Sequence, residues 1–190
     1  MTPFEYVVGI HTIVLGLGTA YLLTTITDTI KYRKSITQYW VHTAWSVVLQ
    51  FLLIGWWYGL WRTIGDEAVI SYGGFLREFA FTLALFMAVR FLILDVDRSQ
   101  GVDLKAHFNE IRIPFFICLG FPYAWAVFIG MWTSEETGTP VGDLVTVVIQ
   151  LAIPIAGALV ANERAQAAFV LIYGVTYLVI EFQQYGVGYG

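Results

Sequence analysis

The stretch PFEYVVGIHTIVLGLGTAYLLTTITDTI, residues 3–30, decides the fold class. A helix needs about 20 mostly apolar residues to cross a bilayer, and this run is longer than that. Its only acidic or basic side chains are Glu5, His11 and Asp28. A cleavable signal peptide would begin with a basic segment, and Glu5 stands where that positive charge is expected. We therefore predict a transmembrane helix here.

Five further apolar runs follow, separated by short charged breaks: 38–61, 69–94, 113–132, 141–161 and 167–183. The chain of 190 residues is 58% hydrophobic and 13% charged, whereas a soluble domain carries about 25% charged residues. The sequence therefore predicts an all-α integral membrane bundle of six transmembrane helices, with residues 1–190 as a single transmembrane domain. The scattered basic residues disfavour nucleic acid as a partner. The lone Cys118 excludes an internal disulfide.

The break of residues 95–112 is the longest. Leu104, Phe108 and Ile111 recur in it at spacings of four and three, which is the stripe of an amphipathic helix. We expect a short amphipathic helix on the cytoplasmic surface, leading into the fourth span. A second face of that helix is either a solvated charged surface or a set of ligands for a divalent metal. The candidate ligands are Asp103, His107 and Glu110.

The charge of the breaks alternates along the chain. The first break, KYRK at residues 31–34, is basic, and so are the third and the fifth. The second break contains Asp66 and Glu67, and the fourth contains Glu135 and Glu136. Because positive loops of membrane proteins face the cytoplasm, both termini are expected on the outer side.

Polar side chains inside the spans are the first functional candidates, because they are costly in a bilayer. At 1.5 Å per residue, one set falls about 10–13 Å below the outer face. This outer polar layer is expected to share contacts or water, either as a solute route or as inert salt bridges, and it consists of His11, Arg77, Glu78 and Glu181. A second layer near the inner face holds Asp28, His42 and Arg90. Two amides, Gln50 and Gln150, lie between the layers near mid-depth.

Two prolines interrupt consecutive spans, Pro122 in the fourth and Pro154 in the fifth. Each has no N–H to donate, which leaves the carbonyls of Cys118 and Gln150 without their helical partners. Interrupted helices often mark substrate or ion sites in transporters, although membrane helices also tolerate proline kinks. With the Gln50 side chain, these carbonyls would offer neutral oxygen ligands to a cation or a small polar solute.

The sequence says less about cofactors and partners than about the fold. His11 and His42 lie about 15 Å or more apart in depth, so they cannot clamp one haem within a protomer. The sequence leaves open a bound lipid, quinone or pigment. Small residues four apart, Gly16–Ala20 and Gly157–Ala161, allow close helix approach. The helices that approach closely belong either to the same chain, to two copies in a homo-oligomer, or to this chain and another membrane protein. The lipid bilayer is the other expected partner.

Four short motifs resemble an uncharacterised family of small polytopic bacterial membrane proteins. They are DLKAHF at 103–108, PFE at 3–5, GLG at 16–18 and WW at 56–57. The resemblance covers the first four spans. It implies the bacterial cytoplasmic (inner) membrane and carries no activity.

Three functions remain in competition. The layered polar residues and interrupted spans favour a small channel or transporter for a cation or small polar solute. The short loops and the lack of a catalytic motif favour a membrane-embedded structural or accessory subunit of a larger, energy-transducing complex. A redox or pigment-binding enzyme is the least favoured, because the histidine depths do not match, and the sequence therefore favours a non-enzymatic role.

Overall fold

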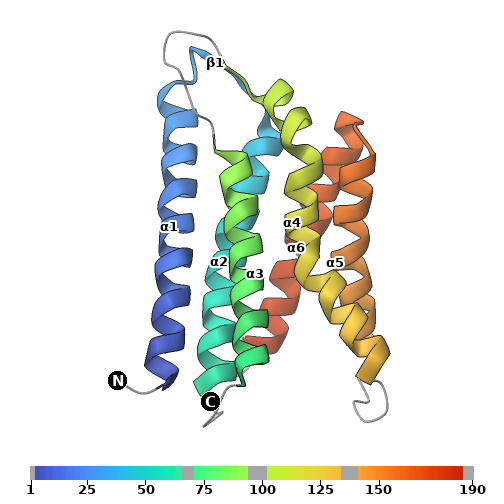
Figure 1. The fold of residues 1–190 in the computed structure, drawn as a ribbon. Coiled ribbons are helices and arrows are strands. Elements are labelled where there is room, and N and C mark those ends of the chain that lie inside the picture. The colour runs from blue at the N-terminus through green and yellow to red at the C-terminus, as the bar shows by residue number, and fades with distance from the viewer. Residues whose placement is uncertain (1–2, 66–70, 94–101, 134–140, 186–190) are drawn as a thin grey trace. The chain divides into compact units, whose positions relative to one another are not determined.

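The computed structural model describes residues 3–65, 71–93, 102–133 and 141–185 (Figure 1). Within them the chain forms six helices: α1 Pro3–Lys31, α2 Trp40–Gly65, α3 Tyr72–Leu92, α4 Leu104–Thr133, α5 Val141–Leu159 and α6 Glu163–Tyr185. Two short strands, β1 Ile36–Thr37 and β2 Val102–Asp103, pair in parallel, with Ile36 opposite Val102. The predicted all-α fold is confirmed, because each predicted span coincides with one helix.

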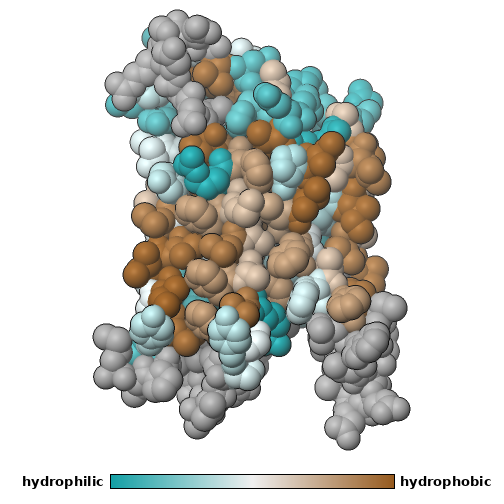
Figure 2. Space-filling view, in the orientation of Figure 1, coloured by the Kyte–Doolittle hydropathy of each residue, from teal (hydrophilic) through white to brown (hydrophobic). Residues whose placement is uncertain are grey.

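Three of the described helices contain a segment long and apolar enough to cross a membrane. These segments are Glu5–Lys31 in α1, Trp40–Leu60 in α2 and Glu163–Gln183 in α6, and α5 holds a shorter apolar segment, Val148–Leu159. Figure 2 shows apolar side chains over much of the face drawn, with hydrophilic side chains beside β1. Crossing of the bilayer by all six helices stays a prediction.

The chain divides into two compact units, Met1–Ile111 and Arg112–Gly190. The single transmembrane domain stays a prediction. In the first unit α1 packs against α2 and α3. Its core is made of large apolar side chains that are at most 3% exposed, among them Leu22, Trp45, Leu49, Leu53 and Leu85. Gly18 lets α1 approach α2, because a Cβ at this position would lie 3.2 Å from Leu53 Cδ1.

The predicted amphipathic helix is not a separate element. It forms the first turns of α4, which runs without interruption from Leu104 to Thr133 and contains Pro114 and Pro122. The predicted apolar stripe is confirmed, since Leu104 and Phe108 are fully buried. The Phe108 ring lies 5.8 Å from the ring of Tyr39, between their centroids, so the stripe packs against protein within the first unit.

The second unit contains the remainder of α4 together with α5 and α6, and α5 packs against α6. Close contact between α4 and α5 depends on two glycines. A Cβ at Gly157 would come within 2.5 Å of the buried Phe116 ring, and one at Gly120 would lie 3.1 Å from Pro154 Cβ. The small residue predicted at Gly157 therefore serves packing inside the chain.

Candidate functional site

Within the first unit, the structure joins Arg77 and Glu78 of the predicted outer polar layer but not His11, and Glu181 belongs to the second unit. His11 is fully buried in the first unit, where its Nδ1 donates to the Val7 carbonyl at 2.7 Å. The rings of Phe75 and Phe79 stand edge-on to its imidazole, at centroid distances of 6.1 and 5.8 Å. Its Nε2 has no hydrogen-bond partner. His11 therefore lies against two phenyl rings and does not bond to Arg77 or Glu78.

Arg77 and Glu78 form an ion pair with each other. Nη2 of Arg77 lies 2.6 Å from Oε1 of Glu78, and Nε of Arg77 donates to the same oxygen at 2.8 Å. The arginine side chain is 47% exposed and the glutamate 15%. Because the two neighbours neutralise each other, the pair fits the structural alternative of the sequence analysis.

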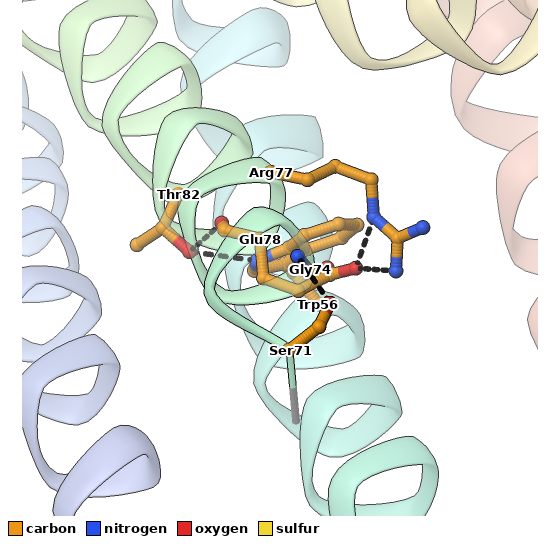
Figure 3. A network of polar contacts seen from close by, with 6 residues as sticks. All are labelled: Trp56, Ser71, Gly74, Arg77, Glu78 and Thr82. Carbon is orange, nitrogen blue, oxygen red and sulfur yellow. Dashed lines mark hydrogen bonds and ion pairs between the residues drawn. The ribbon is translucent and has the colours of Figure 1, made fainter. Parts of the chain in front are cut away.

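The backbone beside this pair is tied to α2 through one hydroxyl (Figure 3). The Thr82 hydroxyl donates to the Glu78 carbonyl at 3.0 Å and accepts from the indole N–H of Trp56 at 2.9 Å. The hydroxyl of Ser71 accepts from the Gly74 N–H at 3.1 Å and caps the start of α3. The Trp56–Thr82 bond joins α2 to α3, whereas the other two bonds lie within α3 and its cap.

The inner layer also differs from the prediction. The guanidinium of Arg90 lies 5.0 Å above the ring centroid of Tyr21, a cation–π geometry. No ion pair joins Arg90 to Asp28 among the residues that the structure describes. In the mid-depth set, Nε2 of Gln50 reaches Thr19 Oγ1 at 3.4 Å and so connects α2 to α1.

The amide of Gln150 is the most unusual polar group of the second unit. Its side chain is 1% exposed, and neither Nε2 nor Oε1 has a hydrogen-bond partner. Pro154, one turn further along α5, has no N–H to donate to the Gln150 carbonyl. Three polar groups of one residue therefore lie inside the protein without their usual partners, as the sequence predicts for the carbonyl.

A polar face of α6 belongs to the same unit, and the sequence analysis singled out Glu181 alone among its residues. We call it the α6 polar face, and it consists of Gln166, Tyr173, Tyr177 and Glu181. The first three are buried and Glu181 is half-buried. Tyr123 of α4 lies beside Tyr173 and near the carboxylate of Glu181. The spacing of four between Tyr173, Tyr177 and Glu181 was the available signal.

Gln166 begins this face, and its role is structural. Its Nε2 donates to the carbonyls of Gly157 at 2.8 Å and Val160 at 2.6 Å, which are at the end of α5. The face extends about 22 Å along α6 from Gln166 to Glu181. Polar groups therefore occur at several depths along one buried side of the helix.

The candidate metal ligands lie at the end of β2 and in the first turns of α4, and two of them make other hydrogen bonds. Oδ1 of Asp103 accepts from the N–H groups of Lys105 and Ala106, at 2.8 and 3.2 Å, and caps the helix. Nε2 of His107 lies 3.2 Å from the Phe91 carbonyl, and Glu110 is exposed. In the described part of the chain no three His, Cys, Asp or Glu side chains gather as a metal site. Asp103, His107 and Glu110 therefore do not gather as one metal site, which was one of the two alternatives for this face.

The structure does bring His107 to His42. Their ring centroids are 5.9 Å apart, and Nε2 of His42 lies 2.9 Å from the Leu92 carbonyl. The carbonyls of Phe91 and Leu92 end α3 and have no partner within that helix. Two histidines from α2 and α4 thus cap the last turn of α3, a contact that the sequence analysis did not predict.

Comparison of the chain with protein families, with characterised proteins and with solved structures finds no match. The resemblance to an uncharacterised bacterial membrane family therefore stays a prediction. The function must be argued from the contacts alone.

Proposed function

We propose that this chain is a six-helix protein of the bacterial cytoplasmic membrane that lets a cation or a small polar solute cross the bilayer. Exposed large apolar side chains support the membrane location, because large apolar patches are unfavourable on a surface that faces water. They occupy the surfaces of the apolar helices and include Ile13 and Leu17 of α1 and Leu171, Val175 and Phe182 of α6.

The observation that carries the transport function is the unpartnered amide of Gln150. Leaving a buried donor or acceptor unsatisfied costs about 1–3 kcal/mol. Oε1 of Gln150 and the carbonyl freed by Pro154 are neutral oxygen atoms, which can replace the hydration shell of a cation or bind a polar solute. A passing solute would supply the hydrogen bonds or coordination that these groups lack.

The α6 polar face extends this site along the helix. The hydroxyls of Tyr173 and Tyr177 can both donate and accept hydrogen bonds. Glu181, at one end of the face, would raise the local concentration of cations through its negative charge. The route that we propose therefore runs through the second unit, between the Gln150 amide and Glu181.

Flux measurements in liposomes test this proposal. Wild-type protein should conduct cations or small polar solutes, and Gln150→Leu should lower that flux because it removes both side-chain polar atoms at similar volume. Gln183→Leu, at an exposed position, is the matched control and should leave flux unchanged. The flux of the Gln50→Leu variant shows whether the first unit contributes to transport. Folded wild-type protein without flux would contradict the proposal and favour the accessory-subunit alternative.

Orientation is tested separately by cysteine labelling in intact cells, after replacement of Cys118 by alanine. We propose that both termini face outward, because the basic breaks belong on the cytoplasmic side. An impermeant thiol reagent should then label Gln183→Cys and spare Ser35→Cys, both at exposed positions. The reverse pattern would invert the topology.

A further inference from the structure

The contact between His42 and His107 leaves one nitrogen of each ring that does not bond to a carbonyl of α3. A carbonyl oxygen can only accept, so each neutral ring must carry its proton on Nε2, where it meets the carbonyls of Leu92 and Phe91. The Nδ1 atom of each ring is then the one with a free lone pair. In His42 this atom is buried, has no hydrogen-bond partner, and belongs to a side chain that is 0% exposed.

This arrangement matches the way in which proteins prepare histidines for metal binding. A ligating histidine almost always donates its other ring N–H to a carbonyl, a carboxylate or water, which fixes the tautomer and the ring orientation. Both histidines of the pair make that bond to the backbone. The two carbonyls lie at the negative end of the α3 dipole, which favours a positive charge nearby.

The spacing of the rings also fits. Two imidazoles that bind one ion at about 2.0–2.1 Å hold their ring centroids about 5–6.5 Å apart. The observed separation is 5.9 Å, with the ring planes inclined at 62°. His11, by contrast, also has an unpartnered ring nitrogen, but its ring neighbours among the described residues, Phe75 and Phe79, offer no second ligand.

We propose that His42 and His107 bind one divalent d-block cation, such as Cu²⁺, Ni²⁺ or Zn²⁺, through their Nδ1 atoms. These ions favour imidazole nitrogen, whereas Mg²⁺ and Ca²⁺ favour oxygen ligands. No third His, Cys, Asp or Glu joins the pair within the described ranges, so water completes the coordination. The site lies in the first unit and does not depend on the proposed transport function.

Copper alone is the probe. Untagged protein in detergent is loaded with one equivalent of Cu²⁺. Its electron paramagnetic resonance spectrum should show nitrogen hyperfine splitting from two imidazole nitrogens bound to the copper. Zn²⁺ should compete for the same site, whereas Mg²⁺ should not. A spectrum with one nitrogen or none, or binding that Mg²⁺ displaces equally well, would overturn the proposal without any variant.

Substitutions then identify the ligands. His107→Gln and His42→Gln should each weaken Cu²⁺ binding tenfold or more, since each removes an imidazole and keeps an amide that can donate to the α3 carbonyls. His11→Gln removes the third histidine and should leave the affinity unchanged. Folding of each variant is checked by its thermal midpoint without metal. Equal binding by folded His107→Gln, or loss of binding in folded His11→Gln, would show that the ion sits elsewhere.

Discussion

The side-chain amide of Gln166, in the first turn of α6, donates to the carbonyl of Gly157 at 2.8 Å and so closes the end of α5. A second bond to Val160 uses the same nitrogen at 2.6 Å. The two helices of this hairpin are therefore joined by a side chain as well as by apolar packing.

Replacing Gln166 by leucine should destabilise the protein by about 1–3 kcal/mol, because two carbonyls at the end of α5 lose a buried donor. The thermal midpoint in detergent, followed by tryptophan fluorescence, measures the change. Gln183→Leu changes an exposed glutamine of the same helix and should have little effect. Equal midpoints for the two variants would argue against a structural role for Gln166.

Gly157→Ala should destabilise the second unit by about 1–3 kcal/mol through overpacking. The added methyl group would meet the Phe116 ring, which is 1% exposed and has little room to turn. Gly16→Ala is the matched change, since no atom lies within 4 Å of a Cβ placed there. The thermal midpoint should fall for the first variant only, and a fall for Gly16→Ala would indicate a close approach that the contacts of the described chain do not show.

Thr82→Val keeps the shape of a fully buried side chain and removes its hydroxyl. The indole N–H of Trp56 would lose its acceptor, which should cost about 1–3 kcal/mol. Thr24→Val is the control, because its hydroxyl makes a similar bond to the carbonyl four residues earlier but is exposed. Urea or thermal unfolding of the two variants should differ, and similar stabilities would remove Thr82 from the contacts that hold α2 against α3.

Glu181→Gln should lower cation flux at low ionic strength and have less effect at high salt, because screening weakens the field of a carboxylate. Liposome flux at two salt concentrations measures this. Glu163→Gln, at the opposite end of α6 and exposed, should not change flux. A salt-independent loss in Glu181→Gln would point to a direct contact with the solute instead of steering.

The sequence predicts the helices well and the interior poorly, for a physical reason. Length and hydropathy locate a span, and each of the six predicted runs became a helix. In helices that are apolar all round, however, periodicity does not reveal which side faces protein. Depth alone suggested that His11 would meet Arg77, whereas the rotation of α1 places it beside Phe75 and Phe79.

The missed contacts are those that link residues far apart in the chain. His42 bonds to the Leu92 carbonyl, and no spacing within one span could signal that contact. Tyr173 was not predicted as part of a polar face, because only the fold brings it beside Tyr123 of α4. By contrast, the unusual carbonyl of Gln150 was predictable, because a proline one turn later is a purely local cause.

The pairing of β1 with β2 has a consequence for biogenesis. Ile36 is 5% exposed, and its partner strand begins at Val102, after both α2 and α3. During synthesis, β1 must therefore wait until this helical hairpin has left the ribosome, and the closed loop adds an entropic cost to pairing. The pairing of β1 with β2 is thus a late step in the folding of the first unit. It can form only when the start of α4 has begun to leave the ribosome.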